Sequence, residues 1–180
     1  MRIISGKYKG KRLMAPKNLP VRPTTDFAKE ALFNILNNQY YFEELQVLDL
    51  FAGTGNIGFE FASRGCPSVT SVDAHSGCVR YIHKISEELS LPITAVKSDV
   101  MKYVEATPHK FDIIFADPPY DFDLQTLTDL SDKILSENLL KPDGILIIEH
   151  TKHHDLSEVA GFEEARKYGG SVFSFFTHLI

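Results

Sequence analysis

Short apolar runs alternate with amphipathic segments along most of this chain, and that alternation limits the folds open to it. Five apolar runs have the length of buried strands, at residues 47–51, 68–72, 93–97, 111–116 and 144–149. Helical periodicity lies between them, at residues 56–64, 76–89, 100–105 and 124–140. Strands that alternate with helices favour a mostly parallel sheet with helices on both faces, so we predict an α/β fold.

The two ends of the chain depart from this alternation. Near the start, residues 27–36 carry apolar side chains at helical spacing behind Thr24 and Thr25, either of which can cap a helix. Near the end, two strand-like runs flank Gly169-Gly170, a pattern that favours a hairpin. These runs are residues 162–168 and 171–179. One edge of the sheet is therefore expected to be antiparallel.

Basic residues are concentrated at the start of the chain. Residues 1–25 contain no acidic residue, and their seven basic residues are Arg2, Lys7, Lys9, Lys11, Arg12, Lys17 and Arg22. The whole chain carries a net charge of −5, so the rest of it carries −12. From Arg2 to Leu13 the side chains alternate in character as in a strand, and Gly6 and Gly10 lie four residues apart. This pattern predicts a short β-hairpin in an extension over residues 1–22, ahead of a main domain over residues 23–180. A structured basic extension favours a polyanion partner over a merely solubilising tail.

The chain's 180 residues are enough for one domain with a buried core. No apolar stretch approaches the ~20 residues that span a bilayer, and the first residues lack the apolar region of a secretion signal. We therefore expect a cytoplasmic protein without a membrane partner. Cys66 and Cys78 are too few for a disulfide framework and have no partners at zinc spacing, so no metal is expected.

A glycine-rich loop follows the first predicted strand. Its glycines, Gly53, Gly55 and Gly58, match the spacing of a dinucleotide-binding fingerprint, and Asp73 follows Gly53 by 20 residues, where an acid would bind ribose hydroxyls. This pattern keeps an NAD-dependent oxidoreductase open as an interpretation. Asp49, however, lies inside the strand, where a carboxylate is costly unless it serves a ligand's ammonium or an amide of the glycine loop.

Carboxylates stand at or near the ends of four successive strands. They belong to Asp49, Asp73, Asp99 and Asp117, and open α/β sheets bind their ligands on that side. Such an acidic rim would repel a pyrophosphate but suits a ligand with a positive charge. S-adenosylmethionine carries a sulfonium, an ammonium, a ribose diol and an adenine, so we predict it as the cofactor. Any one of these acids alone could instead be a helix cap or a turn former.

The fourth strand ends in Asp117-Pro118-Pro119-Tyr120. Each proline fixes φ near −65° and removes an amide donor, so the Asp117 carboxylate and nearby carbonyls form a rigid array of acceptors. Tyr120 adds a flat ring on which a planar group could stack. A nucleobase with an exocyclic amine would satisfy both features, although a Pro-Pro pair can also simply end a strand.

Four motifs together resemble one enzyme family. They are the basic segment from Arg2 to Leu13, Arg22-Pro-Thr-Thr-Asp26 followed by Glu30, Asp49-Leu-Phe-Ala-Gly-Thr-Gly55, and Asp117-Pro-Pro-Tyr120. In this order the chain resembles the class I methyltransferases, and specifically the bacterial 16S ribosomal RNA guanine-N2 methyltransferase family. Ser5, where a glycine is usual, and Asn56-Ile57, in a variable part of the loop, depart from the family's pattern.

The resemblance implies a fold, a reaction and a set of site residues. The fold is a seven-stranded Rossmann-like sheet, and the reaction is methyl transfer to a guanine N2 amine in 16S rRNA, free or in an assembling 30S subunit, by an enzyme that we expect to be a monomer. Catalytic roles fall to Asp117, Pro118, Pro119 and Tyr120. Cofactor contacts fall to Asp49, Phe51, Gly53, Gly55, Asp73, Asp99, Val100 and Asp117. RNA contacts fall to Arg2, Lys7, Lys9, Lys11, Arg12 and Arg22.

Other interpretations remain beside this one. The same acceptors would serve an N6-adenine methyltransferase acting on DNA or RNA, and a non-catalytic RNA-binding module or the NAD-dependent enzyme would differ in class. His150, His153 and His154 cluster after the fifth strand, where we expect solvated loop residues rather than a metal site.

Overall fold

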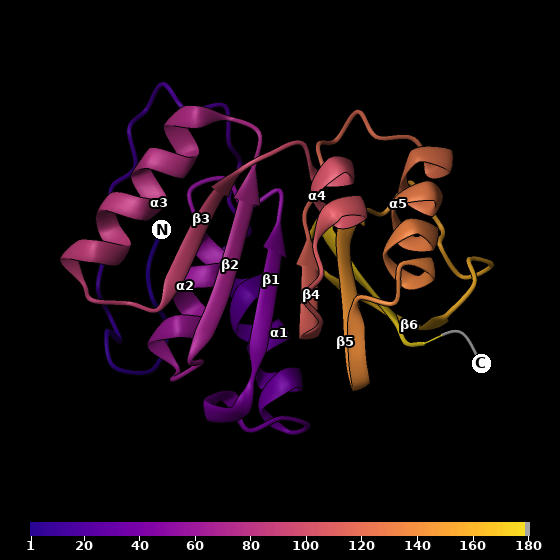
Figure 1. Ribbon diagram of the computed structural model, residues 1–180, viewed down its shortest axis with the longest axis horizontal. Coiled ribbons are helices and arrows are strands. Elements are labelled where there is room, and N and C mark those ends of the chain that lie inside the picture. Colours follow the sequence, from indigo (N-terminus) through magenta and orange to yellow (C-terminus); the bar gives the residue numbers. More distant parts are fainter. Residues whose placement is uncertain (179–180) are drawn as a thin grey trace.

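Seven strands form a single sheet within residues 1–178, the part of the chain that the computed structural model describes. The strands are β1 (Gln46–Leu50), β2 (Ser68–Asp73), β3 (Ile93–Lys97), β4 (Phe111–Ala116), β5 (Leu140–Thr151), β6 (Phe162–Tyr168) and β7 (Ser171–Phe176). Their order across the sheet is β3-β2-β1-β4-β5-β7-β6 (Figure 1). The order reverses beside β1, and this switch point is where open α/β sheets place their ligands.

Strands β1 to β5 pair in parallel, whereas β7 is antiparallel to both of its neighbours. The predicted antiparallel edge is confirmed. Strand β6 is the outermost strand at this edge, and β7 lies between β6 and β5. Strand β5 begins at Leu140, four residues earlier than predicted, because Leu140 already pairs with Phe111 of β4, ahead of a register shift before Ile145. The preceding helix stops early because Asn138 adopts a left-handed φ of 56°.

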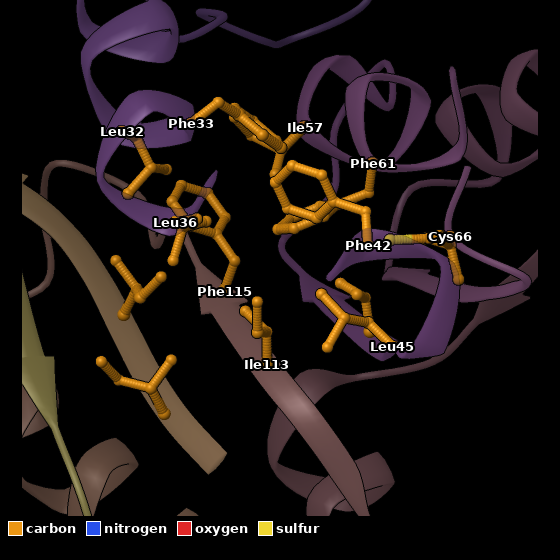
Figure 2. Close-up of a cluster of buried hydrophobic side chains, with 14 of the residues drawn as sticks. Leu32, Phe33, Leu36, Phe42, Leu45, Ile57, Phe61, Cys66, Ile113 and Phe115 are labelled. Carbon is orange, nitrogen blue, oxygen red and sulfur yellow. The ribbon is translucent and has the colours of Figure 1, made fainter. Parts of the chain in front are cut away.

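Helices cover both faces of the sheet. They are α1 (Asp26–Asn37), the short 3-10 helix η1 (Phe42–Glu44), α2 (Asn56–Ser63), α3 (Ser76–Glu88), α4 (Val100–Ala106) and α5 (Leu124–Ser136). Helices α1, α2 and α3 pack on one face, and α4 and α5 on the other. Figure 2 shows the hydrophobic core between the sheet and helices α1 and α2. In this core, Phe33 of α1 and Phe61 of α2 meet edge to face with ring centroids 4.6 Å apart. Aromatic pairs in this arrangement add stability beyond the area they bury.

The N-terminal segment, residues 1–22, is folded against α2 rather than free. Its first 13 residues form the predicted hairpin: Arg2 and Arg12 make an antiparallel bridge, the Ile3 amide donates to Lys11 O at 2.9 Å, and the Leu13 amide donates to Met1 O at 3.0 Å. The backbone amides of Ile4 and Ser5 donate to the Glu60 carboxylate of α2, at 2.8 and 3.1 Å. These two contacts hold the hairpin against the helix. Among the described residues, no helix is long and apolar enough to cross a membrane.

Candidate active site

A cavity of about 590 Å³ lies at the carboxyl ends of the parallel strands. It is lined by most of the site residues predicted from the sequence, namely Arg22, Asp49, Phe51, Gly53, Asp73, Asp99, Val100, Asp117, Pro118, Pro119 and Tyr120. Its volume falls within the range of about 300–1,000 Å³ that is typical of small-molecule sites. One continuous cavity thus joins the glycine loop to the Asp117-Pro-Pro-Tyr segment.

Two glycines of the loop adopt conformations that other residues rarely take. Gly53 has a φ of +57°, and its amide donates to Asp73 Oδ2 at 2.9 Å. Gly55 has a φ of +85° at the start of α2, where an added Cβ would lie 2.8 Å from the Phe59 ring. This second glycine is not part of the cavity wall, so its contribution is to the turn that brings α2 close to β1.

Asp49 is almost completely buried, with 2% of its surface exposed. Its Oδ2 accepts a hydrogen bond from the Gly58 amide at 3.2 Å. Burial raises the pKa of this carboxyl to about 8, the Gly58 amide opposes that rise, and the charge of Asp73 adds to it. Asp49 is therefore a buried acid that a nearby cation would ionise.

Asp73 and Asp99 both bind backbone amides near their own strands. Besides Gly53, Asp73 accepts from the His75 amide at 2.8 Å through Oδ1. Asp99 Oδ1 accepts from the Lys102 amide at 3.0 Å and so caps α4. Each acid fixes a loop and also lines the cavity. Such an acid can cap a helix or hold a loop and still bind a ligand, because a carboxylate has about four lone pairs.

The Asp117-Pro-Pro-Tyr segment leaves β4 at the middle of the sheet. The Asp117 amide donates to Leu50 O of β1 at 3.3 Å, which joins the segment to the end of the central strand. Burial raises the pKa of the Asp117 carboxyl well above its usual value, Glu149 and Asp49 raise it further, and Arg22 opposes the rise. The Tyr120 ring is 58% exposed and has the Arg22 guanidinium 5.0 Å from its centroid.

Glu149 of β5 is a site residue that the sequence analysis missed. It is buried, it lines the same cavity, and its two carboxylate oxygens accept from two hydroxyls. Thr24 Oγ1 donates to Oε2 at 2.5 Å, and Ser171 Oγ donates to Oε1 at 2.9 Å. Thr25, the neighbour of Thr24, provides the predicted cap of α1 by accepting from the Ala28 amide. An acid at the end of an apolar strand was the available sequence signal.

A buried ion pair supports the segment that carries Thr24. Lys29 Nζ donates to Asn56 Oδ1 at 2.7 Å and lies 3.5 Å from Glu60, and both charged side chains are fully buried. Asn56 Nδ2 in turn donates to the Thr24 carbonyl at 3.0 Å. Burial lowers the pKa of Lys29, while Glu60 counteracts this shift. The network connects the start of α1 to the start of α2 beside the cavity.

The predicted RNA-binding residues fall into separate places. Arg22 lines the cavity. Lys7 and Lys9 are exposed on a loop held at the other end of α2, where the Lys7 amide donates to Ser63 O at 2.7 Å. Lys11 and Arg12 are also exposed, and Arg2 pairs with Asp26 at 3.2 Å. Since α2 has eight residues, this loop lies about 12 Å along the helix from the glycine loop.

The expectation for the histidines was wrong at one position. His150 is buried on β5, with Nε2 2.7 Å from Ser174 Oγ and Nδ1 2.8 Å from Thr151 O. Strand β5 extends farther than predicted and pairs with β7, which is why His150 is buried. His153 is exposed and His154 partly so. Within residues 1–178, no group of three or more potential metal-ligating side chains is positioned to hold a metal ion.

The fold and the glycine loop define a class I methyltransferase. The structure of the Thermus thermophilus 16S rRNA N2 G1207 methyltransferase RsmC, in complex with AdoMet and guanosine, has the same fold, with a TM-score of 0.71 and 24% identity over 89% of this chain and 45% of that one. The Thermus hypothetical protein TTHA0928 matches with a TM-score of 0.84 and 28% identity over 98% of each chain.

Sequence comparisons show the family to which this chain belongs. The family described as Conserved hypothetical protein 95 matches residues 1–177. A relative from Haemophilus influenzae, the ribosomal RNA small subunit methyltransferase D, is 34% identical over 163 residues, or 87% of this chain and 81% of that protein. A second protein of that name, from Buchnera aphidicola, is 31% identical over 83% of this chain. The chain belongs to this family, which confirms the resemblance predicted from its motifs.

Proposed function

We propose that this protein transfers a methyl group from S-adenosylmethionine to the exocyclic N2 amine of a guanine in 16S ribosomal RNA. The observation that carries the proposal is the single cavity in which the acid-rimmed glycine loop and the Asp117-Pro-Pro-Tyr segment face one another. Relatives named small-subunit ribosomal RNA methyltransferases support the RNA substrate.

The residues of the cavity fit the proposed cofactor. Asp49 is a buried acid with a raised pKa beside the glycine loop, a costly arrangement that a cationic ligand would relieve. Asp73 would take the ribose hydroxyls, and Asp99 with Val100 would hold the adenine at the end of β3. No basic side chain of the glycine loop is present to neutralise a pyrophosphate. Bound there, the cofactor would supply an activated methyl group on a sulfonium, a good leaving group.

Asp117 would act on the amine rather than on the cofactor. The lone pair of a guanine N2 is delocalised into the ring, so most of the catalysis must come from alignment. The Asp117 carboxylate and the Pro118 carbonyl would accept the two amine hydrogens and stabilise the positive charge that grows on nitrogen. The raised pKa of Asp117 suits it to receive the proton released from N2. Pro119 would keep the segment rigid.

Tyr120 would hold the base on its exposed ring. The guanidinium now beside that ring shows that a flat group can lie there. Arg22 would then turn to a phosphate, together with Arg2, Lys7, Lys9, Lys11 and Arg12 along the N-terminal segment. Because these cations extend about 12 Å from the cavity, they suit a folded RNA rather than a mononucleotide. We propose 16S rRNA, free or in an assembling 30S subunit, as the substrate, a monomeric enzyme, and the cytoplasm as its location.

The test is methyl transfer from tritiated S-adenosylmethionine to 16S rRNA, naked and in partly assembled 30S particles. Nucleoside analysis should identify N2-methylguanosine at one position, and the comparison of the two substrates shows whether the protein acts on free RNA or on the particle. N6-methyladenosine in its place would show that the acceptors serve an adenine amine instead. Absence of transfer to any RNA, with intact binding of S-adenosylhomocysteine, would refute the RNA substrate.

A further inference from the structure

We propose that Glu149 is a specificity-determining residue that accepts the N1–H of the target base and so admits guanine and rejects adenine. This inference rests on the proposed function and deepens it. Asp117 alone cannot make that choice, because an acceptor of amine hydrogens serves the N6 amine of adenine as well as the N2 amine of guanine. The second acceptor beside it decides which base fits.

Asp117 and Glu149 occupy matching positions on adjacent parallel strands. Ala116 of β4 pairs with Ile148 of β5, and each acid is the next residue along its strand. Neighbouring strands are about 4.8 Å apart. Two residues earlier, Phe115 and Ile147 both face the core under α1, so strand alternation sends the two carboxyls to that same side. Both acids line the cavity, and the charge of Glu149 adds to the rise in the Asp117 pKa that burial causes.

Glu149 is held as an acceptor by its surroundings. Hydroxyls of Thr24 and Ser171 each donate to one carboxylate oxygen, which leaves a further lone pair on each oxygen. Burial raises the pKa of Glu149, and these two hydroxyls and Arg22 oppose that rise. Asn56 fixes Thr24 through its carbonyl at 3.0 Å, so the position of Glu149 is set by three separate segments. Among the described contacts, no such hydroxyl pair holds Asp117.

The two bases differ at the atom that faces this second acceptor. On the Watson–Crick edge of guanine, the N2 amine is next to N1–H, so two adjacent donors meet two adjacent acceptors. On adenine, the N6 amine is next to N1, which carries a lone pair. With its amine at Asp117, an adenine would set that lone pair against the Glu149 carboxylate. A site built to hydrogen-bond a group discriminates strongly against an analogue that lacks it, because its buried polar group is left unpaired.

The test compares guanine with 2-aminopurine at the target position of 16S rRNA assembled into 30S particles. 2-Aminopurine keeps the reacting amine but has a lone pair at N1 and lacks the oxygen at C6. Wild-type protein should prefer guanine by at least a hundredfold in kcat/KM. In Glu149→Gln, an amide hydrogen can donate to the N1 lone pair, so the preference should fall at least tenfold. Using the change in preference, rather than one rate, cancels the effect of the missing oxygen.

The matched control is Ser171→Ala, which removes one anchor of Glu149 but keeps its carboxylate. It should retain most of the preference for guanine, whereas a merely structural role for Glu149 would make the two variants behave alike. Binding of S-adenosylhomocysteine should stay within threefold of wild type in both.

Two results would overturn the inference: a wild-type preference below a hundredfold, which needs no variant to fold, or a fall of less than tenfold in Glu149→Gln. If the wild-type protein transfers no methyl group to guanine in 16S rRNA, the proposed function itself fails and this inference fails with it. A wild-type protein that methylates guanine and 2-aminopurine equally would leave the proposed function intact and refute only the role of Glu149.

Discussion

The two sides of the cavity hold their carboxylates in different ways. On the side of β1, β2 and β3, Asp49, Asp73 and Asp99 accept from backbone amides that lie 2 to 20 residues away in the sequence. On the side of β4 and β5, Glu149 accepts from a hydroxyl 125 residues away and from another 22 residues away. The proposed cofactor side is therefore built from local loops, and the proposed base side from distant segments brought together by the fold.

The largest effect should come from Asp117, the acid that separates the two sides. Asp117→Ala removes the proposed acceptor of the amine hydrogens, so we expect kcat to fall by about 10³-fold or more. Binding of S-adenosylhomocysteine, measured by calorimetry, should change no more than a few-fold because the amide-held acids remain. Methyl transfer at the wild-type rate would contradict the assignment, and loss of both properties would show that the two sides are not independent.

The segments that hold Glu149 should depend on the buried Lys29–Glu60 ion pair, which supports the segment that carries Thr24. Lys29→Met removes one of the two cations beside the fully buried Glu60. Breaking a buried ion pair typically costs 3–5 kcal/mol, so we expect the free energy of unfolding to fall by about 3 kcal/mol. Arg64 also contacts Glu60, at 2.8 Å, and limits the loss. Urea denaturation measures this change.

The double variant Lys29→Met with Glu60→Leu is the control for that experiment. It removes both charges and should recover part of the stability. A single variant as stable as wild type would mean that the network does not support this side of the cavity.

Ligand affinity on the side of β1, β2 and β3 should depend on pH. The pKa of Asp49 is about 8, and a bound ammonium favours its ionised form, so binding of S-adenosylhomocysteine should release a proton near neutral pH. The sign follows directly: affinity should rise as pH increases from 6 to 8 and level off above 8. Calorimetry in buffers of different ionisation enthalpy measures the proton release.

Asp49→Asn tests the origin of that dependence. The amide cannot ionise, so affinity should fall about ten- to a hundredfold at pH 8 and should no longer vary between pH 6 and 8. The same pH dependence in this variant would assign the proton to another group, with Asp117 as the candidate.

The smallest effect should come from the loop farthest from the cavity. Lys7→Ala with Lys9→Ala should weaken RNA binding several-fold at low salt and reduce the magnitude of the slope of log affinity against log salt by about 1.4 to 1.8. The matched control is Lys102→Ala with Lys110→Ala, two exposed lysines outside the N-terminal segment. Equal effects of the two pairs in filter binding would remove the N-terminal loop from the proposed RNA interface.

Most of the fold could be predicted because each element carries its own signal. The bounds predicted for β3, β4 and β6 agree with the structure at every residue. The end of helix α5 and the start of strand β5 were predicted wrongly, because a left-handed residue, Asn138, ends the helical region early and a register shift lies within the first residues of β5. The N-terminal hairpin was predicted from its own residues, but nothing in residues 1–22 reveals that Glu60 of α2 accepts from two of their amides.

The sequence by itself determined the acid-rimmed glycine loop and the rigid Asp117-Pro-Pro-Tyr segment, because glycine and proline restrict the backbone wherever they stand and the acids bind amides nearby. Only the tertiary structure decided that Glu149 stands beside Asp117. Its position depends on the register of β5 against β4 and on hydroxyls from both ends of the chain. Hydrogen bonds between such distant segments form only after the core has packed, so no local pattern encodes them.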